Sequence, residues 1–330
     1  MRDGDEEDDG TLPPRDWLGD LGAGAVAALG AGVFVLSIVA MVAIDRIGGT
    51  LTPDDAAARI VAPEVEGVAF EVPRPAPGIV SPRADDPTWM INAAAFDAPP
   101  GRPVMAVIVL DDGTQPETAL QALDWNAPFS FAIAADFDLS PHRVERVRRA
   151  GREALALVPF GYGPDLGADP NVLRRGLSEA ELVRRLRWHL ARAGGEIVGA
   201  IDGQSGDILR DAVALRIVGD ELAAGGMLMI DSREESDSLL SARLRPMGVP
   251  VGRRTARIAR GDSHDVALDA LGQAERHAGT WGTAIVLVEA GEGTMKALSE
   301  WVLTRGSDVA IAPVSHVIRQ LRRGPQYAQN

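Results

Sequence analysis

The chain contains no cysteine and only one lysine, Lys296. Without cysteine the protein forms no disulfide and has neither a thiolate nucleophile nor a cysteine-based zinc site. This absence leaves the compartment open, because a cysteine-free chain tolerates either side of a membrane. With a single lysine, nearly all of the positive charge belongs to arginine. The sequence also lacks a glycine-rich nucleotide-binding fingerprint after any of its apolar runs.

Acidic residues outnumber basic residues in the chain. The 33 basic residues face 47 acidic ones, which gives a formal net charge of −14 and a pI near 4.8. Nucleic acid is therefore excluded as a partner, because binding phosphates requires a clustered basic surface. Much of the acidity lies between Asp3 and Asp9. Such a run is typical of a solvated segment, so we predict a disordered tail over residues 1–20.

A membrane span is predicted directly after this tail. Residues 21–44 contain no charged side chain, and they are bounded by Asp20 and Asp45. A helix of this length crosses a hydrocarbon core of about 30 Å. A buried helix and a cleaved signal peptide are the alternatives, but a signal peptide's apolar region is usually only about 7–15 residues long. Arg2 and Arg15 before the span nearly balance Arg46 and Arg59 after it, so charge does not decide the orientation.

Residues 45–102 are rich in proline, which disfavours helices and central strands. We therefore predict an extended linker between the span and a domain at residues 103–320, with a C-terminal tail at 321–330.

Within residues 103–320, short apolar runs alternate with amphipathic segments. The runs cover residues 104–110, 129–135, 153–160, 196–201, 226–230, 248–252, 284–289 and 309–314. Runs that are apolar at every position favour parallel strands covered on both faces. Helix-start signals stand between them, at Ser140, Ser178, Asp207, Ser263, Thr294 and Ser315. The pattern predicts an α/β fold, either a (β/α) barrel of seven or eight parallel strands or a doubly wound sheet.

Acidic residues follow most of the predicted strands directly. They are Asp111 with Asp112, then Asp136, Asp202, Asp231 and Glu289. The carboxyl ends of parallel strands carry the functional residues in such folds, so these acids are the candidate site. The alternative is that some of them, Asp136 and Asp202 above all, only cap the next helix.

Two of these segments resemble a known family. Val109-Leu110-Asp111-Asp112-Gly113 resembles the first motif of the polysaccharide deacetylases, most closely of their divergent envelope branch, and Ile230-Asp231-Ser232-Arg233 resembles a later strand-end motif. The order of the landmarks fits over about residues 103–320. The resemblance implies a (β/α) barrel that removes N-acetyl groups from glycans of the cell envelope. It also implies that Asp111 is the general base, and that Asp112 and two histidines hold a divalent metal.

The sequence departs from this family at the histidines. Gly203, Leu157 and Glu289 stand about where the family has imidazoles. Of the five histidines, His142, His189, His264 and His277 fall in predicted helices, and only His316 is expected near the mouth of the barrel. Zinc prefers nitrogen ligands, so a zinc site is not expected.

Three interpretations stay open. The first is a deacetylase, active or impaired, with Asp111 and Asp231 at its catalytic centre, where Asp112, Asp202 and Glu289 could hold Mg²⁺ or Ca²⁺ through oxygen alone. The second is a non-catalytic protein that binds a glycan such as peptidoglycan, with Tyr162, Arg233 and Trp125 as candidate contacts. The third is a glycosidase that uses two of the acids. With the predicted span, the resemblance places the protein in the inner membrane and its domain in the periplasm.

Overall fold

The computed structural model describes residues 85–97, 101–135, 140–161, 171–203, 206–233 and 238–324. The predicted acidic tail, the predicted span at residues 21–44, linker residues 45–84 and the tail beyond residue 324 lie outside this set. Within it, no helix combines the length and the apolar character needed to cross a membrane. Residues 85–97, which the proline content assigns to the linker, pack on the domain through the buried Trp89 of α3 (Thr88–Ile91).

The apolar runs form parallel strands, as predicted. In chain order the strands are β1 (Val104–Asp111), β2 (Ser130–Ala134), β3 (Glu153–Val158), β4 (Gly199–Asp202), β5 (Leu228–Asp231), β6 (Val251–Arg253), β7 (Ala256–Ile258), β8 (Thr283–Glu289) and β9 (Ala310–Ile311). The main path of the sheet is β6-β5-β4-β3-β2-β1-β8-β7, and β9 pairs with the start of β1. Strand β7 is too short for its pattern to be recognised in the sequence.

The two ends of this path are consecutive in the chain. Only Arg254 and Thr255 separate β6 from β7. The backbone N–H of Arg254 donates to the carbonyl of Asp231 in β5, and that of Thr255 donates to the carbonyl of Ile285 in β8. The chain thus passes from one end of the sheet to the other within these residues. The predicted class, an α/β fold of barrel type with parallel strands, is confirmed, and the sheet is a curved partial barrel with eight strands along its main path.

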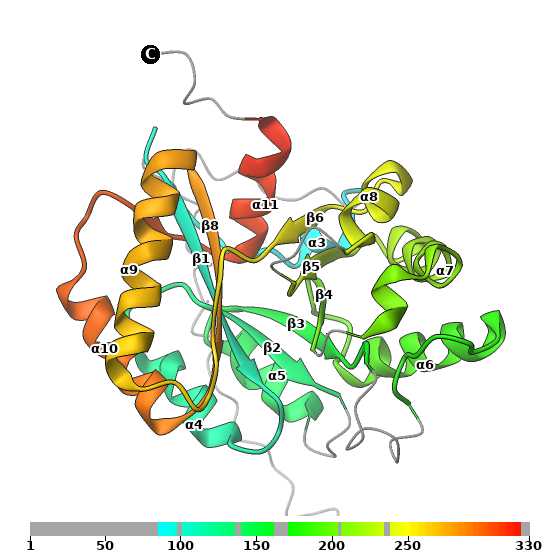
Figure 1. Ribbon diagram of the computed structural model, residues 1–330, viewed down its shortest axis with the longest axis horizontal. Coiled ribbons are helices and arrows are strands. Elements are labelled where there is room, and N and C mark those ends of the chain that lie inside the picture. Colours follow the sequence, from blue (N-terminus) through cyan, green and yellow to red (C-terminus); the bar gives the residue numbers. More distant parts are fainter. Residues whose placement is uncertain are drawn as a thin grey trace, which may run out of the picture. The chain divides into compact units, whose positions relative to one another are not determined.

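Helices follow most of the strands and cover one face of the sheet (Figure 1). They are α4 (Pro116–Leu120), α5 (Ser140–Arg149), α6 (Glu179–Arg192), α7 (Ala212–Ala224), α8 (Leu240–Leu244), α9 (His264–Trp281) and α10 (Glu292–Thr304). The caps predicted at Ser178 and Ser263 are confirmed, since each hydroxyl accepts a backbone N–H of its helix. For α7 the capping side chain is Asp211 rather than Asp207.

The last helix, α11 (Val314–Arg323), packs on the opposite, inner face of the sheet. Its Val314, Val317 and Ile318 join a second apolar cluster with the inward residues of the strands. Gly252 of β6 makes room for the helix, because an added Cβ would lie 2.5 Å from Cδ1 of Ile318. One end of the barrel interior is therefore filled by α11.

A buried glutamate fixes the start of α11. Glu153, the first residue of β3, accepts the backbone N–H of Ser315 at 3.0 Å, the hydroxyl of Ser315 and the backbone N–H of Ala94 at 3.0 Å. Burial raises the pKa of Glu153, and the hydrogen bonds from Ser315 and Ala94 oppose this rise. Ser315 was predicted to cap the helix and instead binds this carboxylate. Because Glu153 opens its strand, α11 lies at the amino ends of the strands and leaves the carboxyl ends free.

We predict that Glu153→Ala strongly destabilises the domain, because it leaves several buried donors without an acceptor. Losses of about 3–5 kcal/mol are typical when a buried polar network is broken. The free energy of unfolding in urea, followed by circular dichroism, measures the effect. The exposed Glu117→Ala is the control and should change it by less than about 0.5 kcal/mol. Equal losses in the two variants would contradict the role assigned to Glu153.

Candidate functional site

The acids that follow the strands gather at the carboxyl edge of the sheet, but they lie on two different faces. Side chains alternate along a strand. Asp111 therefore shares the helix-covered face with Val109, whereas Asp112 shares the inner face with Leu110. The strand registers place the other acids. Asp202 is the register partner of Val158, and Asp231 stands two residues after Met229, so both acids belong to the helix-covered face. Glu289 is the register partner of Leu110, so it belongs to the inner face.

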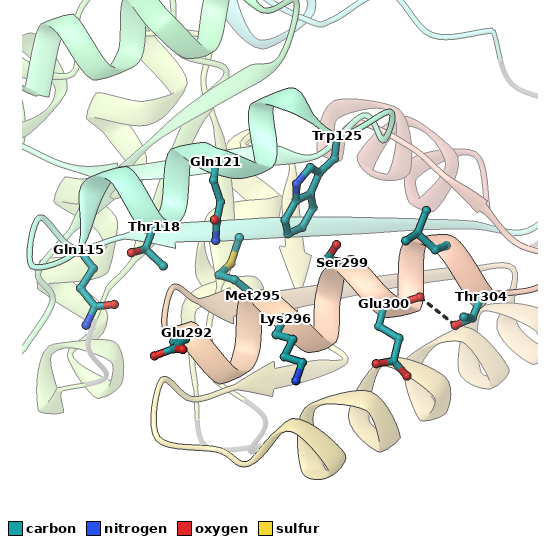
Figure 2. Close-up of a pocket in the computed structure, with 11 residues that line it drawn as sticks. Gln115, Thr118, Gln121, Trp125, Glu292, Met295, Lys296, Ser299, Glu300 and Thr304 are labelled. Atoms are coloured by element: carbon teal, nitrogen blue, oxygen red, sulfur yellow. Dashed lines mark hydrogen bonds between the residues drawn. The ribbon is translucent and has the colours of Figure 1, made fainter.

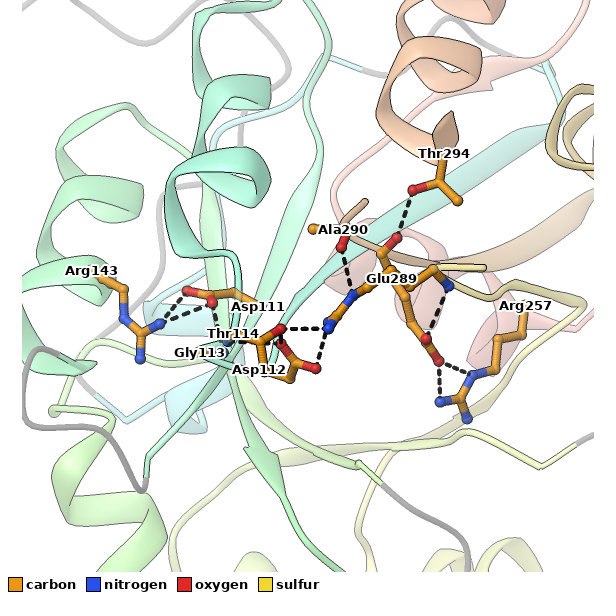
Figure 3. Close-up of polar contacts among 10 residues, drawn as sticks. Asp111, Asp112, Gly113, Thr114, Arg143, Arg257, Glu289, Ala290 and Thr294 are labelled. Carbon is orange, nitrogen blue, oxygen red and sulfur yellow. Dashed lines mark hydrogen bonds and ion pairs between the residues drawn. The ribbon is translucent and has the colours of Figure 1, made fainter. Parts of the chain in front are cut away.

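Asp111, the predicted general base, is engaged by an arginine of α5. Nη1 of Arg143 donates to both carboxylate oxygens, at 2.9 and 2.8 Å, and the backbone N–H of Gly113 donates at 3.0 Å (Figure 3). Nη2 of Arg143 also donates to the carbonyl of Ala134 at 3.3 Å. The carboxylate is fully buried. Burial raises the pKa of Asp111, and the charge of Arg143 opposes this rise. The pair joins β1 to α5 and leaves the carboxylate no contact with solvent.

Asp202 and Asp231 join neighbouring strands at the same edge. The backbone N–H and the hydroxyl of Ser232 donate to the two oxygens of Asp202, at 2.6 and 2.7 Å. Asp231 accepts the backbone N–H of Arg233 at 3.1 Å, and its other oxygen lies 3.9 Å from Nε of Arg253. The Asp-Ser-Arg motif of the sequence thus ties the end of β5 to the end of β4.

The pKa of Asp202 is raised to about 7. Burial is the largest cause, the hydrogen bonds from Ser232 oppose it, and the charge of Asp231 adds to it. Both carboxyl groups are buried on the helix-covered face. A glycosidase needs two carboxylates that reach the same sugar. Asp111 and Asp231 are buried on one face and Glu289 lies on the other, so these acids do not share a substrate-facing surface.

The inner face carries a second group of charges, which we call the mouth cluster: Asp112, Thr114, Arg257, Arg260 and Glu289. Nε of Arg257 donates to Oε1 of Glu289 at 2.8 Å, and the backbone N–H of Arg260 donates to Oε2 at 3.1 Å. The guanidinium of Arg260 donates to the carboxylate of Asp112, the hydroxyl of Thr114 and, at 2.9 Å, the carbonyl of Ala290. One side chain therefore connects the loops that follow β1, β7 and β8 (Figure 3).

Neighbouring residues hold Arg260 in this position. An added Cβ at Gly291 would lie 2.8 Å from Cγ of Arg260, so the glycine admits the side chain. The hydroxyl of Thr294, predicted as a helix cap, donates to the carbonyl of Glu289 at 2.7 Å and fixes the turn before α10. Partial burial raises the pKa of Asp112, but the hydrogen bonds from Thr114 and Arg260 outweigh it, so the pKa is lowered. Asp112 is thus a carboxylate neutralised by a guanidinium.

The described residues do not fit a divalent metal at this position. Oδ2 of Asp112 accepts from Arg260, and Oδ1 accepts from Thr114. The other predicted ligands, Asp202 and Glu289, are bound to Ser232 and Arg257 on opposite faces. In the part of the chain that the structure describes, no group of three or more histidines and acids could hold a metal ion. The oxygen-only metal site stays a prediction, and Asp112, Asp202 and Glu289 are not grouped around a common point in the structure.

The positions where the resemblance implies imidazoles are filled differently. Leu157 is a buried residue of the inner apolar cluster. Gly203 lies against it, so that an added Cβ would stand 3.1 Å from Cδ1 of Leu157. Neither Leu157 nor Gly203 has a side-chain nitrogen or oxygen that could bind a metal ion. Glu289, at the third position, is paired with Arg257.

The five histidines lie in helices, as predicted for four of them. His142 and His277 are exposed, Nε2 of His189 donates to the carbonyl of Asn171, and His264 contacts Glu300. His316 is not near the mouth and instead occupies the first turn of the last helix. It lies in α11 at the amino ends of the strands, edge-on to Phe96, with the ring centroids 4.9 Å apart. Burial there, helped by the charges of Arg319 and Arg323, lowers its pKa to about 4.

The candidate substrate contacts are not brought together by the described residues. Arg233 follows β5, with Nη1 buried and without a hydrogen bond in the described part of the chain. Trp125 lies on the outer side of the fold, after the short 3-10 helix η1 (Gln121–Asp124). Tyr162 and Asp136 are outside the described residues. The three contacts stay predictions, and only Trp125 lines a groove, which is described below.

The arginines are the residues that sequence reasoning missed. Arg143 has the pattern of an amphipathic surface helix, and Arg257 and Arg260 stand in a segment too short to be recognised as a strand. The adjacency of Asp111 and Asp112 was a signal in the sequence that the two acids have different surroundings. Since alternation puts adjacent residues on opposite faces, Asp111 and Asp112 cannot both face the same cavity.

The comparisons with known proteins agree with this architecture. A model of the family described as divergent polysaccharide deacetylase matches residues 107–318. This chain belongs to that family. The resemblance of the strand-end motifs is thereby confirmed. No curated protein matches the sequence.

Several solved structures are similar to the chain at low sequence identity. An uncharacterised protein of Agrobacterium tumefaciens C58 is 22% identical with a TM-score of 0.63, over 72% of this chain and 98% of that one. The catalytic domain of a peptidoglycan N-acetylglucosamine deacetylase from Eubacterium rectale is 15% identical with a TM-score of 0.43, over 68% and 94%. A family 4 carbohydrate esterase from Streptomyces lividans is 12% identical with a TM-score of 0.40, over 64% and 92%.

The raised pKa of Asp202 predicts a pH dependence of stability. The folded state binds this proton more tightly than the unfolded chain, whose pKa is near 3.8. The contribution of Asp202 to stability is therefore greatest below that value and is lost as the pH rises towards about 7. We expect the free energy of unfolding to fall between pH 5 and pH 7, and Asp202→Asn to remove roughly 1–3 kcal/mol of this fall.

Urea unfolding at a series of pH values measures the effect. The exposed Asp308→Asn is the matched control and should retain the fall seen in the unmodified protein. Parallel pH curves for the unmodified protein and Asp202→Asn would show that Asp202 is not the titrating group.

Proposed function

We propose that this chain is an envelope-tethered protein that recognises a glycan through a deacetylase fold but does not catalyse metal-dependent deacetylation. Membership of the divergent polysaccharide deacetylase family supports the glycan as ligand. The pairing of Arg260 with Asp112 is the single observation that carries the non-catalytic part. In the resemblance, Asp112 is the carboxylate that holds the metal.

The charge balance at the mouth supports the proposal. A guanidinium and a divalent cation compete for the same carboxylate oxygens, and the guanidinium belongs to the chain, so its local concentration is always high. It is held from two loops, by Asp112 and Thr114 after β1 and by Ala290 after β8. Gly203 and Leu157, two of the three positions where the resemblance implies imidazoles, have no nitrogen in their side chains.

The predicted general base gives independent support. A base must reach the proton that it removes, directly or through one water molecule. The carboxylate of Asp111 is fully buried on the helix-covered face, and both of its oxygens accept from Arg143. Activating water at the mouth would require breaking this pair and turning the end of β1. The geometry thus favours a structural role for Asp111.

The sequence supports the location and the class of ligand. The uncharged segment at residues 21–44 is proposed to anchor the chain in the inner membrane, with the domain on the periplasmic side. A domain tethered there by a proline-rich linker is within reach of peptidoglycan, an N-acetylated polysaccharide. Peptidoglycan or a similar envelope glycan is therefore the proposed ligand.

The test is acetate release by the full-length protein in detergent micelles, incubated with the N-acetylglucosamine hexamer and Zn²⁺, Mn²⁺, Mg²⁺ or Ca²⁺ in turn. We expect no acetate above the level of an Asp112→Ala variant, together with measurable binding of the hexamer by calorimetry. Metal-dependent acetate release that Asp112→Ala abolishes would overturn the non-catalytic assignment. Absence of binding to the hexamer and to peptidoglycan fragments would overturn glycan recognition.

A further inference from the structure

A groove lies on the outer side of the fold, between the segment formed by α4 and η1 and the face of α10. Its volume is about 890 Å³, within the range of about 300–1,000 Å³ typical of small-molecule sites. Gln115, Gln121, Trp125, Glu292, Lys296 and Ser299 are among the residues that line it (Figure 2). It shares no residue with the mouth cluster, and none of the site residues discussed above except Trp125 belongs to it.

One wall of the groove is an aromatic side chain held in place. The indole of Trp125 packs edge-on to the buried Phe129, with the ring centroids 6.2 Å apart. Its backbone carbonyl accepts a hydrogen bond from Arg152 at 2.9 Å. The indole is half-buried and points towards α10 (Figure 2). Little further ordering is needed for this ring to contact a ligand.

Four polar side chains of the groove have no partners among the described residues, whereas Glu300 contacts His264 and the hydroxyl of Thr304 donates to the carbonyl of Glu300. The amides of Gln115 and Gln121, the ammonium of Lys296 and the hydroxyl of Ser299 make no hydrogen bond or ion pair with other described groups. Elsewhere on this surface charged side chains are paired, as in Arg146 with Glu117 and Arg187 with Glu221. The unpartnered donors and acceptors of the groove are therefore available to a ligand.

The chemistry of the lining selects the class of ligand. Amides and hydroxyls both donate and accept hydrogen bonds, which suits the hydroxyls and N-acetyl groups of a sugar. An indole offers a flat apolar face on which the C–H face of a pyranose ring packs. The ammonium of Lys296 is outnumbered by the carboxylates of Glu292 and Glu300, so the lining has a formal charge of −1, which disfavours an anionic ligand.

The groove begins at the mouth cluster. Gln115 directly follows Thr114, whose hydroxyl accepts from Arg260, and Glu292 directly follows Gly291, which lies against the same arginine. A chain of sugars in the groove would therefore reach the mouth at one end. Towards the other end lie Trp125 and the exposed Leu303 of α10.

We infer that the groove between α4–η1 and α10 is a binding subsite for a neutral N-acetylated oligosaccharide, with Trp125 as the stacking face and Gln115, Gln121 and Lys296 as hydrogen-bonding groups. This inference rests on the proposed function for the identity of the ligand. It adds a location that neither the strand-end motifs nor the family assigns.

Calorimetric titration of the full-length protein in micelles with the N-acetylglucosamine hexamer tests the subsite. We expect Trp125→Leu to weaken binding about tenfold, which corresponds to about 1.4 kcal/mol. Gln121→Ala removes a hydrogen-bonding group from the groove, and Ser299→Trp fills the groove with a large side chain. Both variants should also weaken binding. Trp281→Leu removes an exposed tryptophan elsewhere, so it is the matched control and should bind as the unmodified protein does.

Each outcome decides the question. Hexamer binding that is unchanged in Gln121→Ala and Ser299→Trp, both at exposed or half-exposed positions, would overturn the subsite while leaving glycan recognition intact. Thermal melting of each variant shows whether a loss of binding reflects unfolding. A dimer of the unmodified protein in solution that Ser299→Trp disrupts, without any effect on hexamer binding, would identify the groove as a protein interface and would also overturn the proposal. No hexamer binding by the unmodified protein would overturn both the subsite and its glycan ligand.

Discussion

Guanidinium–carboxylate pairs at the strand ends are the interaction on which this structure depends. A parallel sheet that collects acids at one edge brings like charges together, which raises their pKa values and opposes folding. Here Arg143 neutralises Asp111, Arg257 neutralises Glu289 and Arg260 neutralises Asp112. Each arginine comes from a different position in the fold, so the pairs also connect strands to helices and loops. The carboxylates of the strand-end motifs are thus paired with arginines of the same chain.

The two faces of the sheet explain why these pairs differ in exposure. Asp111 lies between the sheet and α5, where both partners are almost fully buried. Such a pair is costly to break, because removing one partner leaves a buried charge. Asp112 and Arg260 face the mouth and remain partly exposed, so the pair is screened by solvent and worth less to stability. Of the two adjacent aspartates, Asp111 therefore forms a buried ion pair, and Asp112 remains accessible to a ligand.

Much of the fold could be predicted from the sequence, because parallel strands covered on both faces need continuous apolar runs. The eight predicted runs each overlap a strand, and Ser178 and Ser263, which precede α6 and α9, cap these helices as expected. The arginine partners could not be predicted in this way. An arginine on an amphipathic helix has the same local pattern whether it faces water or a carboxylate on a strand. Likewise Ser315 fits a helix cap, and only the tertiary structure brings Glu153 to it from 162 residues earlier in the chain.

The central claim is that Arg260, and not a metal ion, neutralises Asp112. Anomalous diffraction from crystals grown with Mn²⁺ or Zn²⁺ tests it most directly, because it locates the metal and the side chains in one experiment. We predict that the guanidinium of Arg260 lies on the carboxylate of Asp112 and that no anomalous peak falls within bonding distance of that carboxylate. A metal bound to Asp112, with Arg260 turned away from it, would contradict the claim.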